Sequence, residues 1–205
     1  MIQNNFYWNK FYKKFNLSKP SSFAEFVYKK IKNKKNFLSI IDIGCGNGRD
    51  TFFFLKKGFL TDGLDKSRTV IIKNKKKSKN FIQSDICKKK FLKKKYDVIY
   101  CRFFLHSINS KQESVFFDNL KKISKKNTTI YLEFRTDKDP LLKKGQVLSL
   151  NERVFGHYRR FININQFKEA VALKGFKIIK IYQSFKFAIF FKQRPHVARV
   201  VLKCK

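Results

Sequence analysis

A short stretch with three closely spaced glycines constrains the fold of this chain more than any other feature. It spans residues 38–54 and reads LSIIDIGCGNGRDTFFF. The β-branched residues before the glycines predict a short buried strand, and the apolar residues after them predict a helix that begins near Asp50 and Thr51. Glycines between such elements are typical of backbone that adopts a positive φ or approaches a ligand closely. The stretch therefore predicts a strand–turn–helix unit of an α/β sheet.

The spacing of the glycines distinguishes between two kinds of cofactor site. A dinucleotide fingerprint reads G-x-G-x-x-G, whereas here Gly44, Gly46 and Gly48 alternate and Asp42 lies inside the strand. This D-x-G-x-G-x-G pattern resembles motif I of the class I S-adenosylmethionine-dependent methyltransferases. The resemblance implies that S-adenosylmethionine is the cofactor and that these four residues, with Cys45, lie at its methionine part. A tight turn without a ligand is the alternative interpretation.

An acid follows at the end of the next predicted strand, 59–65. Asp65 lies 17 residues after Gly48, where nucleoside-binding α/β folds hold ribose hydroxyls. A carboxylate accepts two hydroxyl hydrogens well, so we expect Asp65 and its neighbour Lys66 to bind the cofactor. Ser67 is expected to cap the helix that follows, and a helix-start acid is the alternative role of Asp65.

A third acid, Asp85, ends the predicted strand 81–85. The resemblance implies that its carboxylate accepts a hydrogen bond from the adenine amino group and that Ile86 lies beside the ring. Arg102 begins the loop after the fourth strand, where the family places residues that face the ligands, and completes the predicted cofactor set. Asp97, at the start of that strand, is expected to be structural.

The remaining apolar runs continue the alternation of strands and helices. Further strands are predicted at 96–101, 128–134, 176–184, 187–191 and 197–202, and further helices at 111–123 and 165–174. The alternation predicts a single domain over 1–205. With the resemblance, it implies a Rossmann-like, doubly wound α/β fold whose seven-stranded sheet is mostly parallel and ends in a C-terminal antiparallel hairpin.

Two segments depart from this alternation. Residues 1–37 form an aromatic and basic lead-in, which we expect to pack on the domain as a helix or, alternatively, to cap the cofactor. The aromatic residues at helical spacing there are Tyr7, Trp8, Phe11, Tyr12 and Phe15. Ser22 and Glu25 fit a capping box for a helix after Pro20.

Residues 135–161 have no clear period and are expected to form an irregular insertion on the substrate side. Four residues of this insertion, Arg135, Tyr158, Arg159 and Arg160, are predicted to bind the substrate. In a chain that otherwise uses lysine, the three arginines of this set, together with Arg102, favour a bidentate site for a phosphate or carboxylate. Surface charge is the alternative.

Two histidines are candidate general bases, since methylation of an oxygen acceptor usually needs one. His106 follows the fourth strand, and His157 lies in the insertion. For each, a structural role is the alternative. The segments Glu133-Phe134-Arg135, Lys138-Asp139-Pro140 and His157 to Phe161 also resemble a bacterial subgroup of small-molecule methyltransferases, some of which are associated with surface-polysaccharide genes.

Composition limits the surroundings and the partners. The four cysteines form no C-x-x-C pair, which favours reduced thiols in the cytoplasm and no bound metal. No apolar run approaches the length of a membrane span. The net charge of +34 is compatible with RNA binding, but only nine of the 48 basic residues are arginine and lysine is spread throughout, which favours compositional drift.

These observations predict a methyltransferase that acts on a small, anionic metabolite or sugar derivative. An RNA methyltransferase of the same fold is a less favoured alternative, because the loop after the fourth strand reads CRFF and lacks the N/D-P-P-Y/F tetrapeptide used on base amines. A binding protein with this fold but no activity is the third interpretation.

Overall fold

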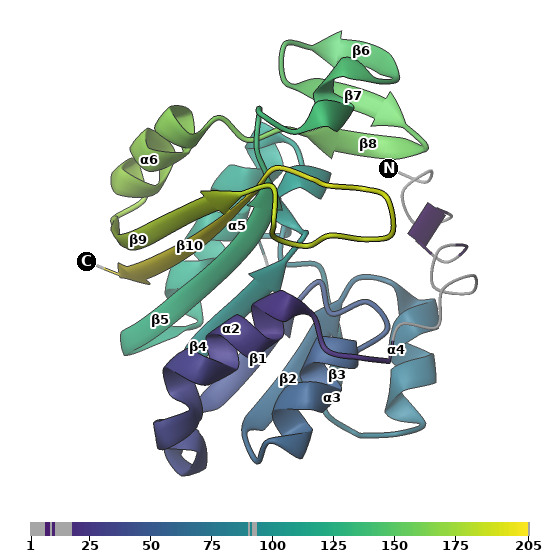
Figure 1. Ribbon diagram of the computed structural model, residues 1–205. Helices are drawn as coiled ribbons and strands as arrows, with labels where there is room; N and C mark the ends of the chain where they lie inside the picture. Colours follow the sequence, from purple (N-terminus) through teal and green to yellow (C-terminus); the bar gives the residue numbers. More distant parts are fainter. Residues whose placement is uncertain (1–6, 9, 11–17, 90, 92–93, 205) are drawn as a thin grey trace.

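A seven-stranded sheet forms the centre of this computed structural model, which describes residues 7–8, 10, 18–89, 91 and 94–204 (Figure 1). The strand order is β3-β2-β1-β4-β5-β10-β9. β10 runs opposite to the other six strands of this sheet. The strands are β1 (Ser39–Ile43), β2 (Leu60–Asp65), β3 (Phe81–Gln83), β4 (Tyr96–Arg102), β5 (Ser124–Arg135), β9 (Phe176–Ser184) and β10 (Val197–Cys204). The predicted fold class is confirmed.

Helices cover both faces of this sheet. They are α2 (Ser22–Ile31), α3 (Arg49–Lys56), α4 (Arg68–Lys75), α5 (Ser110–Lys122) and α6 (Ile164–Leu173), with 3₁₀ turns η1 (Lys32–Phe37), η2 (Leu105–Ser107) and η3 (Pro140–Lys143). Alternate residues of β1 point to opposite faces, so Ile41 packs in one core cluster with α5 and α6, and Ile40 packs in another with α2 and α3.

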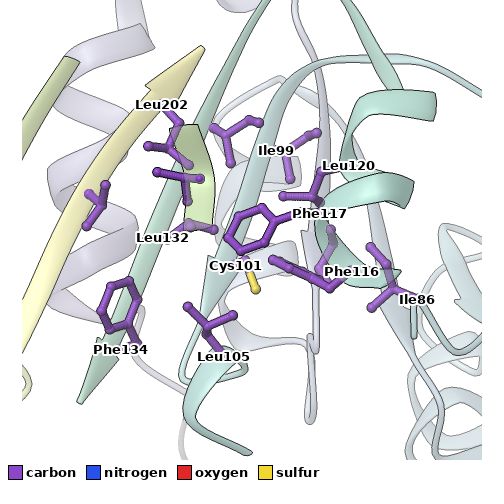
Figure 2. Packing of buried hydrophobic residues seen from close by; sticks show 14 of the residues in the cluster. Ile86, Ile99, Cys101, Leu105, Phe116, Phe117, Leu120, Leu132, Phe134 and Leu202 are labelled. Atoms are coloured by element: carbon purple, nitrogen blue, oxygen red, sulfur yellow. The ribbon is translucent and has the colours of Figure 1, made fainter. Parts of the chain in front are cut away.

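The larger core lies between α5 and the central strands. Phe116, Phe117 and Leu120 are consecutive or one turn apart on α5, and all three are buried. Figure 2 shows these side chains pointing toward Cys101 of β4 and Leu132 of β5. This packing fixes the ends of β4 and β5, from which the site is built.

The chain reverses its direction of winding at β1. From β1 it proceeds through β2 to β3 on one side, and then crosses to β4 and β5 on the other. In open α/β sheets, ligands bind outside the carboxyl ends of the strands at such a switch point. The fold therefore places the candidate site beyond β1 and β4.

The insertion differs from the expectation of irregular chain. It forms a second, three-stranded antiparallel sheet above the carboxyl ends of the large sheet in the view of Figure 1. Its strands are β6 (Gln146–Ser149), β7 (Glu152–Phe155) and β8 (His157–Arg160). Neither β6 nor β7 has a buried residue. Because no face of these short strands packs into a core, their sequences lack the alternation of apolar and polar residues that predicts a strand.

The predicted strand 187–191 is also wrong. Ala188 and Phe191 both have a φ of 50°, a left-handed conformation that does not continue a strand. The segment instead forms a turn within the loop between β9 and β10, closed by an isolated bridge between Phe190 and Gln193. Apolar composition alone therefore gave a false strand.

Two predicted caps need correction. Ser21, not Ser22, caps α2, and its hydroxyl accepts a hydrogen bond from the backbone N–H of Ala24 at 3.1 Å. Ser67 occupies the cap position of α4 without a side-chain cap bond; its backbone N–H instead donates to Asp65 at 2.8 Å. In the part of the chain that the structure describes, no helix has the length and apolar character needed to cross a membrane.

Candidate active site

A cavity of about 490 Å³ lies at the carboxyl ends of the parallel strands. Its walls come from the segments that follow β1, β2, β3 and β4, from β8, and from the loop between β9 and β10. Tyr7 and Trp8 of the lead-in also line it. One end therefore lies beside the glycine turn and the other beside the insertion.

The glycine turn forms a sharp bend at the first end. The backbone N–H groups of Gly44 and Cys45 both donate to the carbonyl of Leu64, at 2.8 and 3.0 Å. Gly44 has a φ of 72°, and a Cβ there would lie 3.0 Å from a ring carbon of Phe104. The turn thus requires glycine for both its conformation and its close approach, and Gly44 and Cys45 line the cavity.

Two acids hold the base of this turn. Asp42 is buried in β1 and accepts a 2.6 Å hydrogen bond from the Thr51 hydroxyl of α3. Burial, with Asp50 nearby, raises the pKa of Asp42 to about 8. Asp50 accepts from the backbone N–H of Ser21 and from the Tyr100 hydroxyl, both at 2.7 Å. The polar residues predicted near the start of α3 therefore join β1, α2 and β4, rather than capping α3.

Asp65 and Asp85 follow neighbouring strands and both line the cavity. The Asp65 carboxylate accepts backbone N–H groups from Ser67 at 2.8 Å and from Gly46 at 3.0 Å. Burial raises the pKa of Asp65. Each of its oxygens retains a further lone pair for a hydroxyl donor. Asp65 therefore fixes the glycine turn and remains able to bind a ribose.

The other predicted cofactor residues are distributed around the same end. Lys66 and Ile86 line the cavity, whereas Gly46 and Gly48 shape the turn from behind it. The side-chain amide of Asn74 donates to the Gly46 carbonyl at 2.9 Å. Gly48 precedes α3 with a φ of 77°. Apart from these two glycines, every predicted cofactor residue lines the cavity.

Arg102 lines the cavity with its charge already paired. Its Nε donates to the buried Glu133 carboxylate of β5 at 2.8 Å. Arg199 of β10 donates to the other oxygen of Glu133, also at 2.8 Å. A carboxylate held by two arginines joins β4, β5 and β10 beneath the site.

The insertion brings only part of the predicted substrate set to the cavity. Successive residues of β8 point to opposite sides: His157 and Arg159 line the cavity, whereas Tyr158 and Arg160 do not. The Tyr158 hydroxyl donates to Glu152 at 2.5 Å. Arg160 pairs with Glu113 of α5. Tyr158 thus links two strands of the insertion, and Arg160 links the insertion to α5.

The two arginines at this end differ in their partners. Arg135 lines the cavity and donates to the buried carboxylate of Asp139 at 2.7 Å. Arg159 is 9% exposed and donates to the carbonyl of Phe155 at 2.5 Å. Burial, with Arg135 nearby, lowers the pKa of Arg159 to about 10. Arg159 is therefore a desolvated cation facing the cavity.

Both candidate bases line the cavity and are buried. The Nδ1 atom of His106 lies 3.4 Å from the backbone N–H of Arg135. Burial lowers the pKa of His106 well below its usual value, and that of His157 to about 3, with the neighbouring arginines adding to the effect. Both imidazoles are therefore neutral near pH 7 and are weak proton acceptors.

Some lining residues were outside the sequence prediction. The loop between β9 and β10 contributes Phe190, which apolar patterning had assigned to the strand 187–191, and Gln193, which had no predicted role. Tyr7 and Trp8 of the lead-in line the cavity beside the insertion, where their rings lie 4.0 and 5.0 Å from that of His157. A cap over the cofactor stays a prediction. Phe11, Tyr12 and Phe15 fall outside the described residues.

The described residues include no group of three or more His, Cys, Asp or Glu side chains placed to hold a metal ion. The loop after β4 carries a different feature. Phe103 has a φ of 55° and lines the cavity. The guanidiniums of Arg102 and Arg135 lie 4.4 and 5.5 Å from its ring centre. Left-handed backbone in a bulky residue costs free energy and often marks a functional loop.

Residues 12–181 match the protein family described as "Methyltransferase domain". No curated protein sequence matches the chain. A solved S-adenosylmethionine-dependent methyltransferase from Clostridium acetobutylicum ATCC 824 has a TM-score of 0.71 at 15% sequence identity, covering 96% of this chain and 98% of that one.

Two further solved structures carry ligands. The glycopeptide N-methyltransferase MtfA complexed with S-adenosyl-L-methionine has a TM-score of 0.67 at 13% identity, with 91% of this chain and 95% of that chain covered. The 1,6-didemethyltoxoflavin-N1-methyltransferase of Burkholderia thailandensis, with its substrate and S-adenosylhomocysteine bound, has a TM-score of 0.68 at 11% identity, covering 89% and 76%. At these identities the likeness shows the shared fold.

Proposed function

This chain belongs to the methyltransferase-domain family, and from that membership we propose that it transfers a methyl group from S-adenosylmethionine to a small, anionic metabolite or sugar derivative. The family predicted from the glycine pattern is thereby confirmed. Structures of the same fold bind S-adenosylmethionine or S-adenosylhomocysteine, which supports the same cofactor here.

The residues at the glycine end fit this cofactor. Asp65 and Asp85 follow adjacent strands, so the two carboxylates offer acceptors for a ribose and for an adenine amino group. The bend at Gly44 leaves room for the methionine part, because a side chain there would fill the space before Phe104. We assign Asp42, Cys45, Lys66, Ile86 and Arg102 to the same end.

Arg159 is the observation that carries the anionic acceptor. The other arginines that line the cavity form ion pairs: Arg49 with Asp50, Arg102 with Glu133, and Arg135 with Asp139. All 14 acidic residues lie in the described part of the chain, and none of them forms an ion pair with Arg159. The Arg159 guanidinium has hydrogen bonds to the Phe155 carbonyl and to Tyr7, and the charge of Asp139 acts on it from beyond ion-pair distance. A buried cation that lacks an ion pair is still costly, and a ligand that supplies the negative charge stabilises it.

The chemistry asks little of the protein beyond position. S-adenosylmethionine supplies a methyl group on a positively charged sulfur, which leaves as a neutral thioether when the acceptor atom forms its bond to the methyl carbon. The walls of the cavity hold the acceptor in line and exclude water. His106 and His157 are neutral and can accept a proton, but their lowered pKa values make them weak bases. They orient the acceptor by hydrogen bonds, and the proton of a hydroxyl acceptor passes to a neighbouring imidazole only as the oxygen bonds to the methyl carbon and becomes strongly acidic.

Isothermal titration with S-adenosylhomocysteine tests the cofactor end. We expect saturable binding, and a loss of roughly 10- to 100-fold in affinity for Asp65→Ala. Asp118→Ala, which breaks an exposed ion pair with Lys174, is the matched control and should bind as the unmodified chain does. Absence of binding, or binding that Asp65→Ala leaves unchanged, would contradict the proposal. Release of S-adenosylhomocysteine with small anionic metabolites and with tRNA, measured side by side, then tests the acceptor class.

RNA is the second candidate acceptor, and the net charge of +34 is the observation that favours it. Affinity that comes from lysines spread over the surface is electrostatic and falls steeply with salt. Filter binding at about 150 mM salt separates the two cases. RNA binding that persists there would favour this alternative over a small metabolite.

A further inference from the structure

We propose that the methyl acceptor is a hydroxy acid, whose carboxylate binds Arg159 and whose hydroxyl binds His157. This rests on the proposed function and names the substrate class of the same site. The proposal commits to a single negative charge and to a neighbouring hydroxyl, and so excludes phosphate monoesters and α-amino acids.

The two side chains share one side of β8. His157 and Arg159 are two residues apart, so both point into the cavity while the residues beside them point away. They are 3% and 9% exposed, respectively. A ligand that reaches Arg159 therefore lies against the imidazole as well.

The balance of charge at this end selects a monoanion. Arg135 is the cation that acts most strongly on Arg159, and it forms an ion pair with Asp139, whose charge also acts on Arg159. Lys66 also lines the cavity but lies beside Asp65 at the glycine end. The Arg159 guanidinium is hydrogen-bonded to the Phe155 carbonyl and to Tyr7, but no acid forms an ion pair with it, so one carboxylate can supply the missing negative charge. A phosphate monoester carries nearly two charges at pH 7, and one of them would remain unbalanced in a desolvated site.

The imidazole of His157 selects the neighbouring group. Among the described residues, neither ring nitrogen of His157 has a hydrogen-bond partner. A neutral imidazole presents one N–H donor and one lone pair, and leaving both unpaired in a buried site is unfavourable. A hydroxyl both accepts and donates, so it can pair with either nitrogen. An ammonium group only donates, and Arg159 would repel its charge.

The rings around His157 define the approach to this site. Tyr7 and Trp8 lie against the imidazole at centre distances of 4.0 and 5.0 Å. Trp8 is the only tryptophan of the chain. A ligand that binds His157 must contact or displace these rings, so the fluorescence of Trp8 reports its binding directly.

The test measures Trp8 fluorescence with protein saturated by S-adenosylhomocysteine. Three matched series of probes are titrated: hydroxy acids (glycolate, lactate, 2-hydroxybenzoate), the same acids without the hydroxyl (acetate, propionate, benzoate), and phosphate monoesters (methyl and phenyl phosphate). We expect the best hydroxy acid to bind at least about tenfold more tightly than its partner without the hydroxyl and than the phosphates. Saturation by none of the hydroxy acids, or tighter binding of a phosphate, would overturn the proposal.

Variants separate the two contacts. Arg159→Gln should weaken the best hydroxy acid by roughly a hundredfold, and Arg159→Lys should weaken it less because the charge remains without the fork. His157→Phe keeps a ring beside Tyr7 and should remove the preference for the hydroxyl while the carboxylate still binds. Lys180→Gln, an exposed change on β9 with the same loss of charge, should have no effect.

A separate titration distinguishes failure of this proposal from failure of the proposed function. Titration of each variant with S-adenosylhomocysteine shows whether its cofactor site is intact, and absence of binding to the unmodified chain would count against the proposed function itself. If cofactor binding is retained while Arg159→Gln and Lys180→Gln bind the hydroxy acid equally well, this assignment of Arg159 is wrong.

Discussion

Replacing His157 by Phe should make the folded chain less sensitive to acid. The imidazole is 3% exposed, and its ring packs against Tyr7 and Trp8. Burial, together with Arg159 and Arg135, lowers its pKa to about 3. Protonation would therefore place an additional positive charge beside two arginines in a desolvated wall. Phenylalanine keeps a ring in the same place and cannot be protonated.

The size of the effect follows from the two pKa values. The unfolded chain binds a proton at His157 below about pH 6.5, whereas the folded chain does so only below about pH 3. Between these values the unfolded state binds more protons, so the stability of the folded state is full above pH 6.5 and falls as the pH decreases. Since one pH unit corresponds to about 1.4 kcal/mol, the loss from pH 7 to pH 5 is about 2 kcal/mol.

Urea unfolding at pH 7 and pH 5 measures this loss in both chains. The unmodified chain should lose about 2 kcal/mol more free energy of unfolding than His157→Phe. Groups common to both chains, including the buried His106, cancel in the difference. The same loss in both chains would show that His157 is hydrated or already charged in the folded state, and would refute this reasoning.

Three further substitutions test the site from other directions. Gly44→Ala requires a positive φ and places a Cβ 3.0 Å from Phe104, so it should lower the free energy of unfolding by about 1–3 kcal/mol and weaken S-adenosylhomocysteine binding; titration showing unchanged affinity would place the cofactor away from the turn. Glu133→Gln leaves two guanidiniums without their shared carboxylate and should cost about 3–5 kcal/mol, seen as a lower midpoint in thermal unfolding; a shift within error would show that solvent replaces the pair. Asn119→Ala removes the amide that donates to two carbonyl groups of the chain after β3, at 2.7 and 2.8 Å, and should cost about 1–3 kcal/mol in urea unfolding; an unchanged stability would mean that water satisfies these carbonyls.

The large sheet was predictable because its signals are local. Buried parallel strands are short apolar runs, and the glycine turn and the acids lie within a few residues of the strand ends. The strands β2 and β4 therefore begin within one residue of their predicted starts at 59 and 96, whereas β5 begins four residues before its predicted start at 128. Where composition misled, as at 187–191, the deciding factor was the left-handed backbone at Ala188 and Phe191, which an apolar sequence does not reveal.

The substrate end was less predictable because it depends on pairing between distant segments. Sequence reasoning grouped four arginines as one anion site. In the structure Arg102 pairs with Glu133 and Arg160 with Glu113, residues 31 and 47 positions away. Which charge remains unpaired is a property of the folded chain, since it depends on the acids that the fold brings within reach.

By itself, the sequence determined the large α/β sheet, the glycine turn after β1 and the acids at the strand ends. Each of these features is encoded in consecutive residues whose conformations are set locally. Only the tertiary structure decided which side chains line the cavity beside the insertion. It paired β8 with β7, so that His157 and Arg159 face the cavity and Tyr158 and Arg160 face away. It also gave each of the other arginines of the cavity wall, Arg49, Arg102 and Arg135, an ion pair with an acid, and gave none to Arg159. Strand register and long-range ion pairs follow from the packing of the whole chain, and they determine which charges this end of the cavity presents.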